Sequence, residues 1–497
     1  MTDLLWASVA LPLIGAVLAA ALPGRAAWVG LVAAISTTAA ALSLATAVWT
    51  QGTLRLDLGG WGVPLGIALQ ADGLSAAFLA MANLVALAVS LYSLGYFAKG
   101  RLERHFWPLW LLVWTALNGL FLAADLFNLY VNLELLGLGA ASLGALTGAR
   151  EAVAANLRYL LVGLLGSMTY LLGVALLYTG LGTLDLQQAA AALGPGPLAW
   201  TAFALMVGGL LLKAALFPLH FWLPPAHANA PAPVSAALSA LVVKAAFYLV
   251  LRLWLDLFGP ATTLGTGMLL GVLGTGAVLW GSWRALRAER LKLMAAYSTV
   301  AQMGYLFLVF PLLAGGPGPA ARADLIAAAV LLALTHGLAK AGLFLSAGLL
   351  QKAAGHDRIA DLGPATQALP LVTLGVALAG VALIGLPPSG TFNAKWILLA
   401  QAIDSGQWWW VPVILLGTLL AAAYIFRVLG GAFDPGPRHG EAQTAALRAE
   451  RGLAEMGPAI QIPGLALGLF AMVVLGLGSA PLWVLLGGAV SGGGGAP

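Results

Sequence analysis

Apolar residues fill long windows that recur along the whole chain, and short polar segments separate these windows. A helix needs about 20 residues to cross the hydrocarbon core of a bilayer. Windows near or above this length lie at 4–22, 27–49, 72–97, 106–124, 126–147, 157–181, 198–217, 233–257, 262–283, 293–312, 323–350, 370–403, 408–430 and 460–487. The pattern predicts an all-α polytopic membrane protein with about fourteen transmembrane helices.

Two of these windows are predicted to hold discontinuous helices. Five prolines stand in the sixteen residues that begin at Pro218, and the segment Leu386–Gly390, with Pro387 and Pro388, divides the window 370–403. A proline lacks the N–H of a helical residue and clashes with the preceding turn. The carbonyls that it frees at membrane depth must be satisfied by protein or by water. Broken helices of this kind mark ion pathways in transporters, and their presence in both halves of the chain predicts inverted repeats.

Composition excludes a soluble protein. Hydrophobic residues make up 61% of the 497 residues and charged residues only 8%, whereas soluble domains contain about 25% charged residues. The chain contains no cysteine, which excludes disulfides, thiolate metal sites and an iron–sulfur cluster held by the chain itself. The apolar run Leu4–Leu22 lacks the positive flank of a signal peptide, so we expect it to be the first span of a single integral domain, 1–497.

Positive charges are distributed unevenly between the predicted loops. One alternating set of loops contains most of the 23 lysines and arginines, whereas the opposite set contains only Arg55 and Arg322. Loops rich in these residues face the cytoplasm, so both termini are predicted to lie outside. No dense basic patch results, which argues against nucleic-acid binding. The cytoplasmic set comprises Arg25, Lys99, Arg101, Arg104, Arg150, Arg158, Arg284, Arg287, Arg290, Lys292, Lys352, Arg358, Arg427, Arg438, Arg448 and Arg451.

A few ionisable residues lie inside the apolar windows. Glu134 is the only acidic residue deep inside one, and Lys213, Lys244, Lys340 and Lys395 have comparably apolar neighbours. An ionisable group at membrane depth costs about 3 kcal/mol on insertion scales, so it normally faces a partner or a water-filled path. One acid and four bases in such a chain indicate proton handling. The alternative for Lys213 is that its apolar stem lets the ammonium reach the membrane surface, an exit that a mid-span lysine at 244 lacks.

His336 and Lys340 lie four residues apart and therefore project from one face of a helix. A histidine titrates near neutral pH, and burial can bring a lysine toward the same range, so the pair is suited to relay protons. A lone histidine in a membrane helix is otherwise often a packing residue. The residues expected to support the pathway are His220, His227, Pro218, Pro387 and Pro388.

These segments resemble the antiporter-like membrane subunits shared by respiratory complex I and the Mrp-type multisubunit sodium/proton antiporters. The resemblance covers residues 92–433, which we take as the core, with 1–91 and 434–497 as peripheral helices. It rests on the order of several motifs. These are Lys213 with Pro-Leu-His-Phe-Trp-Leu-Pro-Pro-Ala-His, then Lys244, Lys292-Leu-Met-Ala-Ala-Tyr-Ser, His336, Lys340, and Leu-Pro-Pro-Ser-Gly before Lys395.

Within this family, residues 118–134 are most similar to the D-type component of Mrp antiporters. A lysine at position 395 fits that component and also the N-type and L-type components of complex I. It argues against the M-type component, which typically has a glutamate there. Asn132 departs from the family, because relatives usually have an aromatic residue at this position.

The resemblance implies a site in which Glu134 faces Lys213 across the fifth and seventh helices. In this site Lys244 carries protons onward, and His336 and Lys340 connect it to Lys395 at the second break. Partners would be other membrane subunits, the transported ions would be protons and sodium, and no cofactor or metal is expected. The location would be the inner (plasma) membrane. The residues expected to transfer protons are Glu134, Lys213, Lys244, His336, Lys340 and Lys395.

Three functions are compared. The favoured one is the proton-translocating subunit of a cation/proton antiporter, which is driven by ion gradients and is not an enzyme. The second is the equivalent N-like subunit of a redox-driven complex I-type NADH:quinone oxidoreductase or membrane-bound hydrogenase, where the chain would belong to a translocase. A passive scaffold is disfavoured, because titratable residues in the membrane carry an insertion cost without a structural return.

Overall fold

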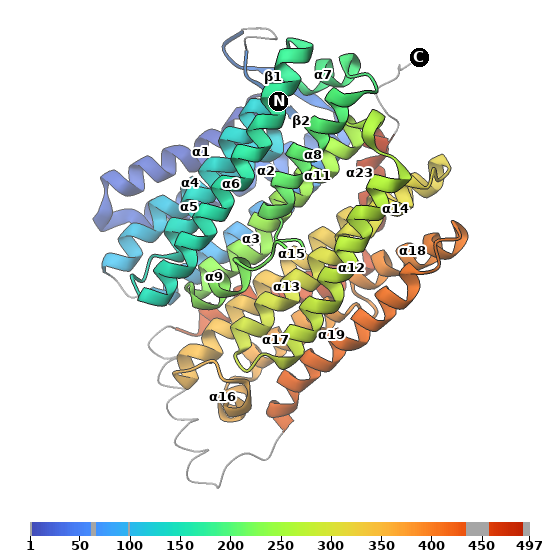
Figure 1. The fold of residues 1–497 in the computed structure, drawn as a ribbon. Helices are drawn as coiled ribbons and strands as arrows, with labels where there is room; N and C mark the ends of the chain where they lie inside the picture. The colour runs from blue at the N-terminus through green and yellow to red at the C-terminus, as the bar shows by residue number, and fades with distance from the viewer. Residues whose placement is uncertain (1, 61–65, 98–99, 434–456, 491–497) are drawn as a thin grey trace.

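The computed structural model describes residues 2–60, 66–97, 100–433 and 457–490, and it shows a bundle of long helices with a small hairpin at one end (Figure 1). Several residues used in the charge argument, Lys99, Arg438, Arg448 and Arg451, lie outside the described residues. The same holds for residues 434–456 and 491–497 of the predicted peripheral region.

The first half of the chain forms helices that pack both on their neighbours in sequence and on more distant helices of the same half. They are α1 (Asp3–Ala21), α2 (Ala26–Gln51), α3 (Gly73–Tyr96), α4 (Arg101–Leu122), α5 (Leu126–Gly144), α6 (Arg150–Leu181), α7 (Leu186–Ala192) and α8 (Pro197–Lys213). The side chains of Asp72, Asp125 and Asp185 accept hydrogen bonds from the first-turn amides of α3, α5 and α7. These caps explain why the three helices begin where they do.

The second half begins with short helices and continues with long ones. They are α9 (Leu223–Asn229), α10 (Ala232–Ala237), α11 (Val243–Asp256), α12 (Leu264–Arg287), α13 (Leu291–Phe307), α14 (Val309–Ala314), α15 (Pro319–Ala354), α16 (Gly363–Ala368), α17 (Pro370–Ile384), α18 (Gly390–Asp404), α19 (Trp410–Phe433), α21 (Gln461–Leu469), α22 (Leu475–Leu477) and α23 (Ala480–Val490). A π-helical turn, Leu238–Val242, connects α10 to α11.

The described helices make the chain a multi-pass membrane protein. Eleven of them are long and apolar enough to cross a bilayer, or twelve if the bent segment that begins at Gln461 is one span. The shorter apolar helices α8 and α17 are parts of the two broken windows. Every predicted window therefore lies on one or more helices, while the number of crossings stays a prediction. Large side chains such as Leu161 and Leu419 remain 60% and 68% exposed, as a surface facing lipid or other membrane subunits would.

Both predicted helix breaks are present. α8 ends at Lys213 and regular helix returns only at α9, while α17 ends at Ile384 and α18 starts at Gly390. The prolines of each break cannot donate to the preceding turn. The window 460–487 was predicted as continuous, and this was wrong: Gln461–Leu477 and Ala480–Gly487 meet at 74°. Glycine, serine and proline stand at this bend, and none of them favours a continuous helix there.

A two-stranded hairpin is absent from the all-α prediction. β1 (Leu54–Asp57) pairs antiparallel with β2 (Ala68–Ala71), and Leu54 lies opposite Ala71. The segment alternates apolar and polar residues from Leu54 to Asp57, which is the period of a strand. It lies between two apolar windows and is too short for a helix, so the window search missed it.

The two ends of the bundle differ in charge. The end that carries β1, β2, the start of α3 and the end of α11 is called the hairpin face (Figure 1). The opposite end is called the arginine face. There Lys352 donates to the carbonyl of Tyr96, and residues 290 and 358 form a backbone bridge. Arg101, Arg150 and Arg287 lie at helix ends of this face. Which face lies in the cytoplasm stays a prediction.

Two helices form the centre of the bundle. The most apolar stretches of Ala232–Asp256 and of α15 are fully buried, because other helices surround them; α15 contacts α3, α13, α17, α18 and α21. Lys244 and Lys340 lie on these central helices and are 0% exposed. The fold therefore places these two amines at the centre of the bundle, away from lipid and bulk solvent.

Candidate functional site

The first buried pair joins Glu134 on α5 to Lys213 at the end of α8. Lys213 Nζ lies 3.6 Å from Glu134 Oε1, and 10% and 17% of the two side chains are exposed. The ammonium also donates a 3.2 Å hydrogen bond to the carbonyl of Leu133. A cavity of about 10 Å³ beside the pair is lined in part by Gly137 and Tyr159, and this is about the volume that one water needs. The expected contact across α5 and α8 is thus present.

The break after α8 holds Lys213 at a helix end. Residues 214–222 form turns, and the indole of Trp222 donates to the carbonyl of Leu212 at 2.9 Å, so one carbonyl freed at the end of α8 has a partner. Pro218 lies within these turns. His220 is 8% exposed and stacks on Phe217. The break therefore supplies polar groups beside the pair without opening it to bulk solvent.

Lys244 follows the π-helical turn and points back toward it. Its Nζ donates a 2.5 Å hydrogen bond to the carbonyl of Ser239, and the Ser239 hydroxyl bonds to that of Thr299 at 2.7 Å. A π-turn leaves a carbonyl outside the regular helical ladder, a feature frequent at functional sites. A second cavity of about 10 Å³ lies between Lys213 and residues Val242 and Ala246, which flank Lys244 on its helix. Among the described residues there is no direct contact between the two lysines.

Two histidines lie among the buried lysines. His227 on α9 and His336 on α15 are 0% and 1% exposed, and neither ring nitrogen of either residue has a hydrogen-bond partner among the described residues. Buried polar groups of this kind normally bond to ordered water. The charges of Lys244, Lys340 and Lys395 all act on His336, so this ring stands electrostatically between the three amines.

Lys340 lies one turn after His336 on α15, as the spacing predicts. Its Nζ donates a 2.7 Å hydrogen bond to the carbonyl of Ala295 and a second bond to the Ser298 hydroxyl. Both acceptors belong to α13. The ammonium is therefore held by neutral oxygens, which leaves its charge without an acidic partner in the described residues.

Lys395 occupies the second break. Its Nζ donates to the carbonyl of Ile384, the last residue of α17, at 3.1 Å and to the Thr418 hydroxyl at 3.0 Å. The ammonium also lies 4.0 Å from the centre of the Tyr305 ring, within the range of a cation–π contact. Gly385 has φ +88°, so a residue that tolerates this conformation turns the chain next to the lysine. Pro387 and Pro388 complete the break.

Lys292 is a buried lysine that the loop assignment missed. It was counted among the cytoplasmic loop residues, but it is 2% exposed on the first turn of α13 and donates to the carbonyl of Ala230. Its charge acts on His227 together with those of Lys244 and Lys340. The signal was available, because Lys292 opens the Lys-Leu-Met-Ala-Ala-Tyr-Ser motif. Its position at a window edge led to the wrong assignment.

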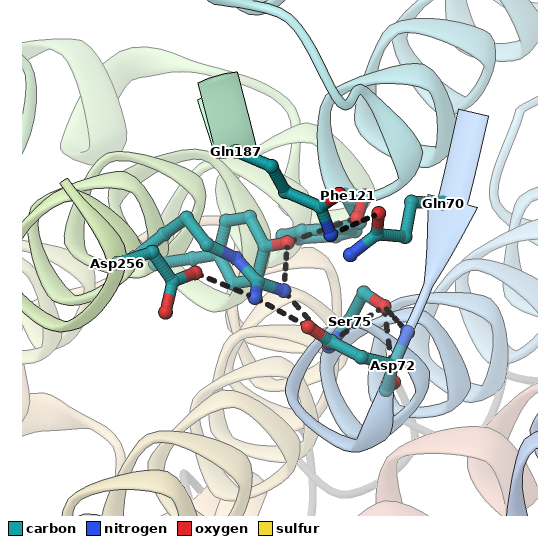
Figure 2. A network of polar contacts seen from close by, with 8 residues as sticks. Gln70, Asp72, Ser75, Phe121, Gln187 and Asp256 are labelled. Carbon is teal, nitrogen blue, oxygen red and sulfur yellow. Dashed lines mark hydrogen bonds and ion pairs between the residues drawn. The ribbon is translucent and has the colours of Figure 1, made fainter. Parts of the chain in front are cut away.

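A second polar network, also missed, lies at the hairpin face (Figure 2). Arg252 on α11 donates to both carboxylate oxygens of Asp72 at 2.5 and 2.8 Å and to Asp256 at 2.9 Å. Burial alone would raise the pKa of Asp72, but the Arg252 charge and hydrogen bonds from Arg252 and Ser75 lower it to about 2. Asp72 stood at a window edge, and no sequence pattern links it to a residue 180 positions later.

The site holds buried amines and imidazoles rather than a cluster of metal ligands among the described residues. No group of three His, Cys, Asp or Glu side chains within the described ranges could hold a metal ion. The buried polar groups instead lie in three places: the Glu134–Lys213 pair, the central helices with Lys244 and Lys340, and the second break with Lys395. The roles of these residues in transport stay predictions.

Two family models match the sequence. Residues 123–421 match the model described as NADH:quinone oxidoreductase/Mrp antiporter, TM. Residues 60–106 match the model described as NADH-Ubiquinone oxidoreductase (complex I), chain 5 N-terminus.

Curated relatives and a solved structure extend these matches. The chain is 36% identical over 453 residues to the N-type component of the NADH-quinone oxidoreductase of Desulforudis audaxviator, which covers 88% of this chain and 87% of that one. It is 27% identical over 407 residues to the D-type component of the Na(+)/H(+) antiporter of Alkalihalophilus pseudofirmus, with 80% of both covered. A chain in the structure of the Mrp complex from Dietzia sp. superimposes with a TM-score of 0.84 and 26% identity, over 99% of this chain and 97% of that one.

Proposed function

Because the chain belongs to the family of NADH:quinone oxidoreductase and Mrp antiporter membrane subunits, we propose that it is a proton-translocating subunit of a multisubunit cation/proton antiporter. One observation carries this proposal. A series of four buried amines lies in the interior, and each of them donates to a backbone carbonyl: Lys213, Lys244, Lys340 and Lys395.

The Glu134–Lys213 pair is the element that can direct a proton. The carboxylate stabilises the ammonium while the two lie 3.6 Å apart, and interaction energy falls with distance. Movement of Glu134 away from Lys213 destabilises the charged amine and favours transfer of its proton to the next group. Conformational change or ion binding in a neighbouring subunit supplies this movement.

Beyond the pair, the proton passes through Lys244, His336 and Lys340 toward Lys395. His336 is suited to this step, because an imidazole has one nitrogen that accepts and one that donates, and neither is bound by the described protein. Lys340 lies one helical turn further on. The charge passes from Lys340 to Lys395. The neutral hydroxyl of Ser298 binds the first ammonium, and that of Thr418 binds the second.

The exchanged cation, the orientation and the partners are parts of the same proposal. Sodium is the cation that Na(+)/H(+) antiporter relatives name, and other membrane subunits are the partners that an Mrp complex implies. The arginine face lies in the cytoplasm of the inner membrane, following the distribution of positive charge. Residues 92–433 form the transporting core of the single domain, and 1–91 and 434–497 are peripheral.

The test is reconstitution of the purified complex in vesicles with a pH-sensitive dye inside. A sodium gradient is expected to drive proton movement, and Lys213→Ala is expected to reduce it to the rate of empty vesicles. Arg101→Gln, a change of an exposed charge at the arginine face, is the matched control and keeps the flux. Proton flux that is unchanged in Lys213→Ala would remove the buried series from the pathway.

A redox-driven role is the second candidate, and a specific observation favours it. The relative with 36% identity is the N-type component of an NADH-quinone oxidoreductase. In that case the same residues pump protons while other subunits carry out electron transfer. Gentle purification followed by mass spectrometry separates the two functions, because small antiporter subunits would accompany the chain in one case and iron–sulfur subunits in the other.

A further inference from the structure

Beyond Lys244, helix α11 carries polar side chains that the proposed pathway does not use. Lys244, Tyr248, Arg252 and Asp256 recur every four residues, so they follow one face of the helix from the centre of the bundle to the hairpin face. The Tyr248 hydroxyl donates to the carbonyl of Phe121 at 2.9 Å and accepts from Arg252 at 3.0 Å. The line therefore connects the central lysine with the network in Figure 2.

An open cavity of about 690 Å³ lies beyond this line. Arg252, Tyr248 and Asp72 form part of its inner wall, and its outer wall includes the exposed side chains of Gln187 and Asp256. The volume is many times the ~30 Å³ that one water occupies, and carboxylates and amides line the cavity. It is therefore a wet space that extends from the hairpin face toward the interior.

Two layers of side chains form the inner wall of the cavity, and both include residues of α11 that follow Lys244 by one or two turns. The outer layer is charged: Arg252 holds both oxygens of Asp72 and one oxygen of Asp256, and only 11% of the Arg252 side chain is exposed. The inner layer is apolar. The rings of Phe78, Phe121 and Tyr248 lie 5.0 to 5.8 Å from one another and are at most 2% exposed. Water that enters the cavity therefore meets the fixed positive charge of Arg252 and then a layer of packed aromatic rings.

We propose that this cavity is the outer part of a second, water-filled access route to Lys244, and that Arg252, latched by Asp72, is the gate that keeps protons in the cavity from reaching that lysine. The inference rests on the proposed function and adds an opening at the hairpin face to it. A guanidinium stays charged at all relevant pH values, so it repels protons and cations while it stands in the route.

Asp72 and Asp256 differ in a way that suits a latch. Asp72 is held at the N-terminus of α3 by the Ser75 amide and hydroxyl, whereas 36% of the Asp256 side chain is exposed. Arg252 contacts both, so it can leave the rigid carboxylate and remain paired with the exposed one at the cavity wall. Opening in this way moves the charge aside without leaving it unpaired, a state that is costly for a buried ion.

The test measures passive proton leak. The purified complex is placed in vesicles without sodium, and a potassium diffusion potential drives protons past an internal pH dye. Arg252→Gln is expected to raise the leak by at least about tenfold, because the fixed charge that repels protons is gone. Arg252→Lys, which keeps the charge, and Arg55→Gln, which breaks the Arg55–Asp185 ion pair of the same face, are expected to keep the leak at the wild-type level.

A double variant tests whether the leaking protons pass through Lys244. In Arg252→Gln/Lys244→Ala the leak is expected to return to the wild-type level, because the access route then ends without an acceptor. An unchanged leak in Arg252→Gln, or a raised leak that persists after loss of Lys244, overturns the gate. Absence of sodium-driven proton flux in the wild-type complex would instead count against the proposed function.

The lack of cysteine in the chain provides a measurement that does not depend on the stability of Arg252 variants. Ala190 lines the cavity and Ala202 is fully buried away from it. Ala190→Cys is expected to react with a charged, membrane-impermeant thiol reagent added from the hairpin side, and Ala202→Cys is not. If neither cysteine reacts with the reagent, the cavity is not filled with water and the proposal is overturned.

Discussion

Lys213 and Lys395 occupy equivalent places in the two halves of the molecule but have different partners. Each lies at a proline-containing helix break, and each donates to a backbone carbonyl, Leu133 for one and Ile384 for the other. Lys213 also has a carboxylate at 3.6 Å. Besides its carbonyl, Lys395 has the Thr418 hydroxyl and the face of the Tyr305 ring, and no carboxylate among the described residues.

The difference indicates where control is exerted. A lysine beside a carboxylate changes its environment strongly when the carboxylate moves, because opposite charges interact over several ångströms. A lysine held by a hydroxyl and a ring has contacts that act only at short range. We infer that Lys213 is the site at which an outside event directs the proton, and that Lys395 passes on what it receives.

The largest expected effect comes from giving Lys395 the partner that it lacks. Thr418→Asp places a carboxylate where the hydroxyl lies 3.0 Å from Nζ. A permanent ion pair in the interior would hold the charge and slow proton flux by about a thousandfold, given roughly 4 kcal/mol for a close pair at an intermediate dielectric. The neutral change Thr418→Asn, which has the shape of the aspartate, is the control and should retain most of the flux. Undiminished flux in Thr418→Asp would mean that Lys395 does not carry the proton.

Replacing Lys292 tests whether proton transfer in the first half of the molecule needs a further amine. It lies next to the first break and is bound to Ala230 rather than to an acid. Lys292→Gln keeps the hydrogen bond and removes the charge that acts on His227, so we expect proton flux to fall about tenfold, a change of about 1.4 kcal/mol in the barrier. Lys352→Gln, at the same face, serves as the control. If both variants transport equally well, Lys292 has a purely structural role.

Replacing Tyr305 tests how the charged form of Lys395 is stabilised. A cation–π contact is worth about 0.5 to 2 kcal/mol, so Tyr305→Leu is expected to lower flux by roughly two- to thirtyfold. Tyr305→Phe keeps the ring over the ammonium and should stay close to the wild-type rate. If Phe and Leu give the same loss, the hydroxyl rather than the ring is the important group.

Sequence periodicity predicted most of the helices and both breaks, because each depends on local composition. The positions of Glu134, His336 and Lys340 could also be predicted, since an ionisable group in an apolar window is conspicuous and helical spacing relates its neighbours. The hairpin was missed because strands of four residues are shorter than any window. The bend after Leu477 was missed because the residues on both sides of it are apolar.

Other parts of the site depend on tertiary structure. The Asp72–Arg252 pair joins residues far apart in the chain, and neither stands in a motif that points to the other. Lys292 was assigned to a loop because it lies at a window edge, while its burial results from packing of α13 against α9. The neutral ligands of the lysines, such as Ser298 and Thr418, are common residues whose function becomes visible only when the helices pack.

The smallest expected effects concern two glycines. Gly385 lies close to Lys395, and Gly137 lies close to Lys213. A Cβ at Gly385 would lie 3.3 Å from Lys395 Cδ at a backbone φ of +88°, whereas a Cβ at Gly137 would lie 3.5 Å from Lys213 Nζ in an ordinary helix. Gly385→Ala is therefore expected to destabilise the protein by about 1 to 2 kcal/mol. Gly137→Ala should leave stability equal or slightly raised, because alanine favours a helix by about 0.5 to 1 kcal/mol, and should lower flux only a few-fold. Thermal unfolding followed by tryptophan fluorescence separates them. A lower midpoint in Gly137→Ala than in Gly385→Ala would show that the space beside Lys213 is more tightly constrained than the turn beside Lys395.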